Sequence, residues 1–398
     1  MATNARSDQR GIAIKFVVLV GAMSFFADFT YEGSRSIVGP YLALLGASAA
    51  AVGIVTGFGE LLGYGLRVVS GRLSDRTGQF WPITIFGYAI QMASVPLLAF
   101  VGRWELAAVL IVIERVGKAT RNPPRDVMLS HAGKQIGYGW AFGVHEALDQ
   151  SGALVGPLVA AAVLAFGGDL RAAFLVLAIP AALTLAILVA ARLQYPRPEE
   201  MEFEPPDVRA AGLPRLFWSY LAGAALVAAG FVDFPLIAYH FAQASILPAT
   251  SVPVFYAIAM GAGGAGSLAF GRLFDRFGLG VLLPLTLVTA FFAPLVFLGD
   301  EISSLFGMIL WGIGIGVHES IIPAAIAPMV PRDRRASAYG LFTAGYGLAW
   351  FVGSAAVGLL YAVSIPLIVA LSVLLELAAI PIFFIVMRRA RRQRTRVA

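Results

Sequence analysis

Ionisable side chains interrupt apolar segments of this sequence at spacings that suit proton transfer or the binding of a charged molecule. Asp28 and Glu32 lie one helical turn apart in an otherwise apolar stretch, and Arg35 follows three residues later. A charge within a membrane-spanning helix is costly, so it marks by default a pathway for a substrate or for protons. These acids could therefore bind protons or a cation, whereas Glu32 and Arg35 could also form a local ion pair.

A second group of charges repeats along one face of a later segment. Glu114, Lys118 and Arg121 recur at positions i, i+4 and i+7, with Arg115 beside them. A continuous charged stripe on a helix must face a cavity or a watery vestibule rather than lipid. The two prolines of the following "RNPPRD" are expected to end this helix.

The next apolar segment carries a third group of ionisable residues. His145 and Asp149 are one turn apart, and Glu146 lies on an adjoining face. Because neighbouring spans run antiparallel, these residues are expected at the depth of the charged stripe, where ion pairs between the two helices are reasonable. Glu146 or Asp149, once released from Arg115 or Lys118, would carry a proton, and a permanent structural pair is the alternative.

The second half of the chain holds fewer embedded charges. Its candidates for the substrate or proton pathway are Asp233, His318 and Glu319. His240 and Glu376 are also embedded, but we assign them no role in the pathway.

The composition defines the setting in which these charges lie. Of the 398 residues, 59% are apolar and 13% are charged, and the mean hydropathy is +0.81. Soluble domains are about 45–50% apolar and about 25% charged, so the sequence predicts a polytopic membrane protein. The chain contains no cysteine, which excludes disulfides and thiolate metal sites. The first residues lead directly into an apolar run, which predicts a retained first span rather than a signal peptide.

Segments of about 20 apolar residues, long enough to span a bilayer, occur twelve times. The predicted spans are residues 12–35, 50–70, 81–101, 105–122, 137–166, 170–192, 215–243, 250–270, 279–298, 303–328, 336–362 and 364–387.

The basic residues predict the orientation of these spans. With the N-terminus in the cytoplasm, most of the 29 Lys and Arg residues fall in cytoplasmic segments, while the opposite loops keep Arg103 and Arg171. This asymmetry places both termini in the cytoplasm, and we expect a multi-pass protein of a bacterial inner (plasma) membrane. The predicted domains are a six-helix bundle over 1–192, a Pro-rich acidic linker over 193–214, and a second bundle over 215–398 that ends in a basic tail.

The two halves repeat one another in sequence. "GRLSDRTG" at 71–78 returns as "GRLFDRFG" at 271–278, and the stretch 138–152 aligns with 339–353 at an offset of 201. A parallel duplication of this kind places a substrate site at the interface between the halves.

These residues resemble the major facilitator superfamily over essentially the whole chain. That resemblance implies an all-α membrane fold of 12 transmembrane helices in two pseudo-symmetric six-helix bundles. The family's signature loop matches Gly71, Arg72, Asp75, Arg76 and Gly78, and its second copy supplies Gly271, Arg272, Asp275, Arg276 and Gly278. Gly71 and Gly78 are expected to allow a tight turn. Asp75 is expected near the start of the third span, where it could latch the halves when the cytoplasmic side is closed.

A second motif resembles the fifth-helix motif of drug/proton antiporters in this superfamily. It comprises Gly143, Gly152, Gly156 and Pro157, but Ala160-Ala161 replaces the usual final glycine pair. The glycines predict close helix packing, and the proline predicts a bend. Arg115 similarly resembles an arginine of the family's fourth-helix motif that is linked to proton transfer.

These patterns favour secondary active transport by alternating access, with proton-coupled efflux of a small amphipathic or cationic compound as the leading interpretation. Divalent metal export, proton-coupled uptake of a small metabolite and a non-transporting receptor are the alternatives. We expect no enzyme, cofactor, resident metal or nucleic-acid partner, and we expect a monomer whose partners are the substrate, protons and the lipid bilayer.

Overall fold

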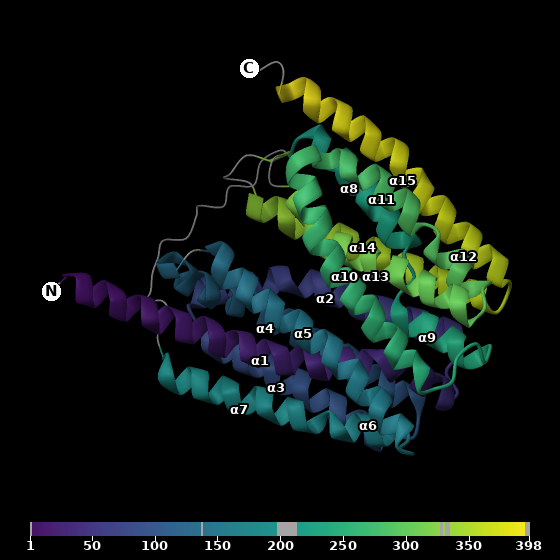
Figure 1. Ribbon diagram of the computed structural model, residues 1–398, viewed down its shortest axis with the longest axis horizontal. Coiled ribbons are helices and arrows are strands. Elements are labelled where there is room, and N and C mark those ends of the chain that lie inside the picture. Colours follow the sequence, from purple (N-terminus) through teal and green to yellow (C-terminus); the bar gives the residue numbers. More distant parts are fainter. Residues whose placement is uncertain (1, 137, 197–212, 327–328, 331–334, 395–398) are drawn as a thin grey trace. The chain divides into compact units, whose positions relative to one another are not determined.

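The computed structural model describes residues 2–136, 138–196, 213–326, 329–330 and 335–394. In that part of the chain the regular structure is α-helical, with short 3₁₀ turns and no β-strand (Figure 1). In chain order the elements are α1 (Ala2–Leu44), α2 (Ala49–Thr77), α3 (Phe80–Leu97), η1 (Leu98–Phe100), α4 (Trp104–Ile136), α5 (Tyr138–Ala165), α6 (Leu170–Val176), α7 (Ala178–Gln194), α8 (Arg215–Gly230), α9 (Phe234–Gln243), α10 (Ser251–Phe277), η3 (Gly278–Val281), α11 (Leu282–Thr289), α12 (Phe292–Phe297), α13 (Glu301–Ala324), α14 (Arg335–Tyr361) and α15 (Ile365–Arg394).

Eleven of the described helical segments are long and apolar enough to cross a membrane. The remaining predicted span, 105–122, lies within α4, whose "IERVGKATR" stripe lowers its hydropathy. The all-α membrane fold expected from the sequence is confirmed.

The prediction that the prolines end the fourth span is wrong, because α4 continues to Ile136 with Pro123 and Pro124 inside it. A proline within a helix leaves the carbonyl four residues earlier without its N–H donor. For Pro123 that carbonyl belongs to Ala119, and the hydroxyl of Ser70 in α2 donates to it at 2.9 Å. A side chain from a neighbouring helix thus replaces the lost backbone bond.

The predicted continuous span 215–243 is in fact broken into α8 and α9. Gly230 ends the first helix, and Asp233 caps the second by accepting a bond from the N–H of Phe234 at 3.0 Å. The carbonyls freed at the break are bonded by side chains: Ser372 donates to Gly230 at 2.6 Å, and the indole of Trp311 donates to Val232 at 2.9 Å. An irregular backbone segment is stable inside a bundle only where its polar groups are satisfied in this way.

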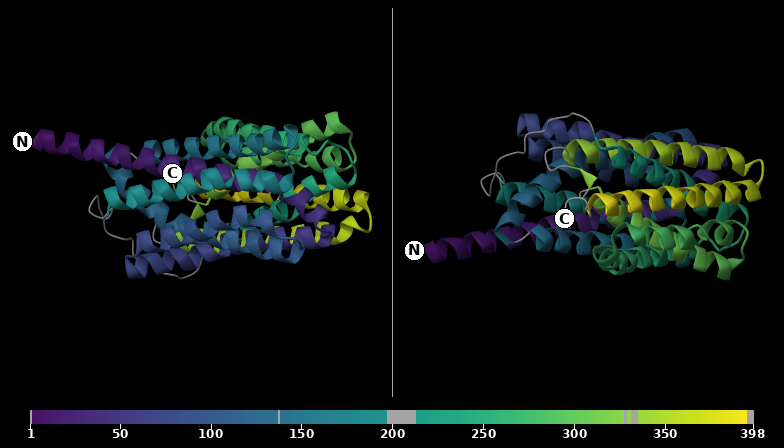
Figure 2. Two further views of the ribbon diagram at one scale, coloured as in Figure 1. Left: turned by 90° about the horizontal axis from the view of Figure 1, so that it is seen from below. Right: turned by 90° about the horizontal axis from the view of Figure 1, so that it is seen from above.

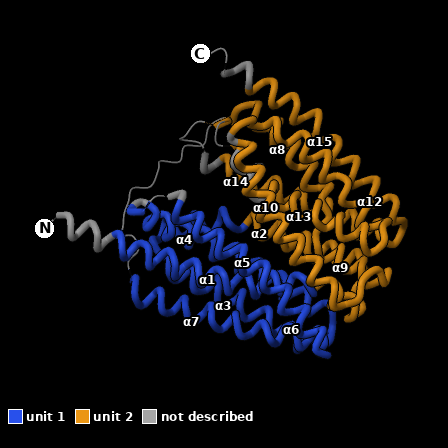
Figure 3. Tube along the Cα trace, viewed as in Figure 1, with its two compact units in different colours: residues 1–37, 66–205 blue, residues 38–65, 206–398 orange. Residues whose placement is uncertain are grey.

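The chain divides into two compact units (Figure 3). The first comprises residues 1–37 and 66–205, and the second comprises residues 38–65 and 206–398. The division into domains over 1–192 and 215–398 stays a prediction, and most of the predicted linker lies outside the described residues.

Within the first unit, α3 packs against α4 and α7, and α4 packs against α5 (Figures 1 and 2). Its buried apolar core includes Phe16, Trp81, Tyr88 and Met128. Within the second unit, α8 packs against α14 and α15, and α10 packs against α13. Each unit therefore has its own buried helix interfaces, and these interfaces fix the side chains described next.

Candidate functional site

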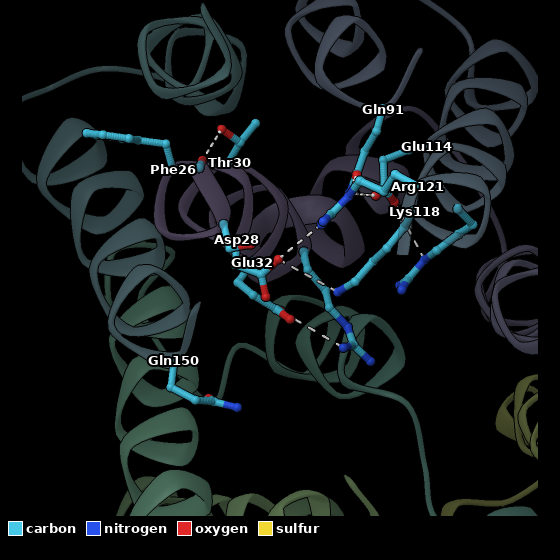
Figure 4. Close-up of polar contacts among 12 residues, drawn as sticks. Phe26, Asp28, Thr30, Glu32, Gln91, Glu114, Lys118, Arg121 and Gln150 are labelled. Atoms are coloured by element: carbon cyan, nitrogen blue, oxygen red, sulfur yellow. Dashed lines mark hydrogen bonds and ion pairs between the residues drawn. The ribbon is translucent and has the colours of Figure 1, made fainter. Parts of the chain in front are cut away.

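The predicted acid Asp28 lies at the centre of a buried ion network in the first unit. Its Oδ1 atom is 3.5 Å from the guanidinium of Arg121 and 3.9 Å from the ammonium of Lys118, both on α4 (Figure 4). One carboxylate therefore accepts two cations. The other predicted acid of α1, Glu32, is 3.9 Å from Arg35 on the same helix, which agrees with a local ion pair.

Arg121 is fully buried in the network, with none of its side chain exposed. In addition to Asp28, its guanidinium donates to the hydroxyl of Tyr88 at 2.8 Å and to the amide oxygen of Gln91. Gln91 in turn donates to Glu114 at 2.9 Å. A buried charge is tolerated when its partners replace the lost water, and Arg121 obtains them from α1 and α3.

The aromatic ring of Tyr31 on α1 contacts two cations of the charged stripe. The ammonium of Lys118 lies 3.6 Å from the centroid of this ring, and the guanidinium of Arg115 lies 4.8 Å from it. Both distances are within the range of cation–π attraction. Arg115 is also 3.6 Å from Glu114. The Lys118 side chain remains 19% exposed, so it is more accessible than Arg121.

The ionisable residues of α5 separate into buried and exposed ones. His145 is buried and shares a 2.8 Å hydrogen bond with Ser24 of α1, which also accepts a bond from Arg125 of α4 at 3.4 Å. Asp149 lies close enough to Asp28, Arg125 and Lys118 to interact electrostatically with each of them. Its buried Oδ1 atom has no hydrogen-bond partner among the described residues.

Glu146 is exposed, and it accepts a bond from Gln150 on its own helix at 3.0 Å. The structure therefore places His145 and Asp149 at the α1–α4 network, and the exposed Glu146 at its edge, where it interacts electrostatically with Asp149.

The glycines of the α5 motif lie against the backbone of α1. A side chain at Gly152 would overlap the carbonyl of Phe25, and one at Gly156 would overlap the carbonyl of Phe29. Gly143 has open space around its Cβ position. Gly152 and Gly156 thus form a close seam between α1 and α5, as small residues separated by three positions do in membrane helices. Pro157 lies within α5, one residue beyond the seam.

The signature sequence is helical rather than a turn, which corrects the expected position of Asp75. Residues 71–77 form the end of α2, so Asp75 lies in its last turns and not at the start of α3. Within residues 71–78, Gly78 is the one residue with a positive φ, at 65°. In the second copy Gly271 is likewise helical, and Gly278 ends α10 with φ of 63°.

The arginines of both copies are exposed, namely Arg72, Arg76, Arg272 and Arg276. The side chain of Asp275 lies outside the part that the structure describes, so a latch by either aspartate stays a prediction.

The candidates of the second unit are distributed over separate environments. Asp233 caps α9 at the helix break, and Glu376 on α15 accepts a bond from Thr289 at 3.2 Å. His240 shares a 2.9 Å hydrogen bond with Tyr361. His318 is surrounded by aromatic rings, with that of Phe231 at 4.4 Å between centroids. The side chain of Glu319 lies outside the described residues.

Sequence patterns missed the polar residues that complete the network, namely Ser24, Tyr31, Tyr88, Gln91 and Arg125. Tyr88 and Gln91 are three positions apart in an otherwise apolar span, a spacing that places both on one helix face. That spacing is the signal that could have revealed them.

A polytopic bundle of helices with ionisable side chains buried inside it defines the class of multi-pass membrane transport proteins. The family model described as the Major Facilitator Superfamily matches residues 20–354. The chain belongs to the major facilitator superfamily, and it is therefore a secondary transporter that moves a small molecule or an ion across a membrane.

Relatives and solved structures agree with this family. An uncharacterized protein of Mycobacterium tuberculosis is 42% identical and covers 94% of this chain and 93% of its own length. An uncharacterized transporter of the superfamily from Methanocaldococcus jannaschii is 31% identical over 36% of this chain and 35% of its own.

Among solved structures, the nucleoside transporter NupG in a mutant form has a TM-score of 0.75 at 13% identity and covers 92% of this chain and 100% of its own. The peptide transporter POT in a mutant form has a TM-score of 0.76 at 15% identity and covers 95% and 94%. These two likenesses show the fold.

Proposed function

We propose that the protein is a proton-coupled antiporter that exports a small amphipathic or cationic compound by alternating access. The observation that carries this proposal is the placement of two carboxyl groups among the cations of α4. Asp28 is held by Lys118 and Arg121. Asp149 interacts with Lys118 and Arg125, and its Oδ1 atom has no hydrogen-bond partner in the described part of the chain.

Proton exchange at these acids would change the forces between three helices. In a site of low dielectric constant, one unit of charge changes the attraction between neighbouring ionic groups far more than it does in water. Protonation of Asp28 removes the charge that holds Lys118 and Arg121 against α1. The other charged or titratable groups at this site come from four helices, namely Tyr31 of α1, Tyr88 of α3, Glu114, Arg115 and Arg125 of α4, and His145 and Glu146 of α5.

A cationic substrate and a proton compete for Asp28 in this mechanism, since either of them neutralises the carboxylate. Lys118 is the cation that a substrate would displace, because its ion pair is the longer of the two and its side chain is partly exposed. Proton entry from outside then releases the substrate, and proton loss toward the cytoplasm restores the network.

The α1–α5 seam supports export. The resemblance of Gly152, Gly156 and Pro157 to the antiporter motif is accompanied by direct backbone contact with α1. A seam without side chains between two helices suits a pivot that stays sealed while the helices tilt. The distribution of basic residues supports a bacterial inner-membrane protein with both termini in the cytoplasm, and we propose that it acts as a monomer.

Reconstituted vesicles test this proposal. Purified protein is placed in sealed proteoliposomes with a pH-sensitive dye inside, and ethidium is added as the cationic probe. We expect ethidium to drive proton movement in the opposite direction. Asp28→Asn and Asp149→Asn should each reduce that movement at least about tenfold, whereas Asp169→Asn should have no effect, because Asp169 is an exposed N-cap outside the network and Asn also caps helices.

Each alternative function has its own outcome in the same assay. Full proton movement in both Asp28→Asn and Asp149→Asn would show that these two acids do not couple protons to transport. Movement triggered by Ni²⁺ but not by ethidium would favour metal export, and probe movement in the same direction as protons would favour uptake. Flux that never exceeds that of empty vesicles, with ethidium, metals, sugars and organic acids each tried, would favour a receptor.

A further inference from the structure

The second unit contains a group of aromatic rings that the proposed proton pathway does not use. His318 of α13 lies among Phe231, Tyr346 and Trp350, with centroid distances of 4.4, 6.1 and 5.9 Å. Its ring meets all three edge to face, an arrangement that aromatic pairs prefer. We call these four residues the aromatic box. They come from the α8–α9 break, from α13 and from α14, so the box joins three separate segments of the unit.

Two polar atoms inside the box are left without hydrogen bonds. The indole Nε1 of Trp350 and the imidazole Nδ1 of His318 are both buried and have no partner among the described residues. The residues themselves are 3% and 7% exposed. Buried Trp N–H groups usually find an acceptor, and a buried polar atom without one lowers the stability of the folded state.

Two other buried aromatic residues of this unit have hydrogen bonds for their polar groups. Trp311 donates its indole N–H to the carbonyl of Val232 at 2.9 Å, and Tyr220 donates its hydroxyl to the carbonyl of Ile322 at 2.7 Å. Within the box, the indole of Trp350 and the imidazole of His318 therefore each keep a nitrogen without a hydrogen-bond partner among the described residues. This pattern is typical of a ligand site, in which aromatic walls surround a few polar groups that orient the ligand.

From these contacts we infer that the aromatic box binds the planar aromatic part of the transported compound, which has a hydrogen-bond acceptor on its edge. The acceptor takes the N–H of Trp350, and a second polar atom beside it bonds Nδ1 of His318. Phe231 and Tyr346 provide ring contacts. This inference rests on the proposed transport function and narrows its substrate class from amphipathic compounds to aromatic ones with a polar edge.

Binding to the purified, nanodisc-embedded protein tests this inference without any transport step. The probe is 2-quinolone, whose flat bicyclic ring carries a carbonyl acceptor next to an N–H donor. Equilibrium dialysis should show saturable binding, and decahydro-2-quinolone, which keeps the polar edge but lacks the aromatic rings, should bind at least about tenfold more weakly. Each lost ligand hydrogen bond is expected to weaken binding up to about tenfold.

The variants Trp350→Phe and His318→Phe keep a ring at each position and remove its nitrogen atoms. Each should weaken 2-quinolone binding about tenfold. Trp218→Phe is the matched control, because Trp218 is exposed and lies outside the box, and its binding should equal that of the unaltered protein. The melting temperature of each variant shows whether it is folded. If one of the two box variants does not fold, 2-quinolone binding to the other tests the inference.

Absence of saturable 2-quinolone binding, or unchanged binding in both box variants, would overturn the inference. Such a result with intact ethidium-driven proton movement would leave the proposed function standing. Intact 2-quinolone binding without proton movement would instead remove proton-coupled antiport and keep the aromatic box.

Discussion

The first unit uses charges and the second uses aromatic rings on helices that correspond in the sequence repeat. In the alignment of 138–152 with 339–353, His145 corresponds to Tyr346 and Asp149 to Trp350. His145 and Asp149, in the first unit, adjoin the ion network of α1 and α4. Tyr346 and Trp350, in the second unit, adjoin His318 within the aromatic box.

The backbone packing of these helices is retained although their side-chain chemistry differs. Gly152 aligns with Gly353, and each lies against a carbonyl of a neighbouring helix, that of Phe25 in the first unit and that of Ala229 in the second. Glycine at these positions is required by the close approach of two backbones. The duplicated unit thus preserves its helix contacts while the positions around them differ: ionic in one half and aromatic in the other.

The largest expected loss of stability follows a substitution of Arg121 in the ion network of the first unit. Arg121→Met leaves Asp28, Tyr88 and Gln91 without their shared donor, and loss of one partner of a buried ion pair lowers stability by about 3–5 kcal/mol. The thermal unfolding of the detergent-solubilised protein measures this change. Arg103→Met, at an exposed arginine paired with Glu105, should stay within about 0.5 kcal/mol of the unaltered protein.

A double-variant cycle makes this prediction more specific. Asp28→Asn combined with Arg121→Met should destabilise the protein less than the sum of the two single variants, because the second change removes the charge that the first one leaves unpaired. Additive effects would show that the two residues do not interact in the folded protein.

Alanine substitution of a glycine that contacts a neighbouring backbone should lower stability by a similar amount in both units. Gly156→Ala places a methyl group against the carbonyl of Phe29, and Gly353→Ala does the same at Ala229. Overpacking of this kind costs about 1–3 kcal/mol, and melting temperatures measure it. Gly143→Ala has open space and should be neutral or slightly stabilising, because alanine favours a helix more than glycine does. If Gly143→Ala lowered the melting temperature as much as Gly156→Ala, close packing of α5 against α1 at Gly156 would not explain the loss.

In the second unit, removal of a satisfied indole N–H should have a smaller effect than removal of Arg121. Trp311→Phe leaves the carbonyl of Val232 at the α8–α9 break without its donor. The expected loss is about 1–2 kcal/mol, which unfolding in detergent can resolve. Trp218→Phe, at an exposed position, is the control, and equal melting temperatures for the two variants would show that this bond does not stabilise the break.

The smallest predicted effect concerns the hydroxyl that supports α4. Ser70→Ala removes the donor to the carbonyl of Ala119 and should lower stability by about 1 kcal/mol. Ser151→Ala is the matched control, because Ser151 is exposed and bonds only within its own helix. If Ser70→Ala and Ser151→Ala unfold at the same temperature, water or another group satisfies this carbonyl.

Apolar windows of the sequence predicted the membrane-spanning helices well, because burial in lipid requires long apolar runs. They did not predict the continuation of α4 past Pro123, since the stabilising hydroxyl of Ser70 comes from a residue far away in sequence. The break before Asp233 was missed for a similar reason: Trp311 and Ser372, which satisfy it, lie on distant helices.

The sequence placed Asp28 among the candidate pathway residues, and spacing on single helices predicted the charged stripe that lies beside it in the structure. The partners of Arg121 could not be read in this way, because Tyr88 and Gln91 meet it only once α3 packs against α4. The aromatic box was not predicted either. Rings in an apolar helix give no periodic signal that distinguishes a ligand site from ordinary packing.

The unbroken course of α4 has a mechanical consequence. Lys118 lies before the two prolines and Arg125 lies after them, and both are carried by one helix. A break at the prolines would let the two ends move separately. Because α4 continues, the proposed displacement of Lys118 from Asp28 would also move Arg125 relative to Ser24, which bonds His145. In the proposed mechanism, α4 would therefore couple the Asp28 ion pair to the contacts of Ser24 and His145.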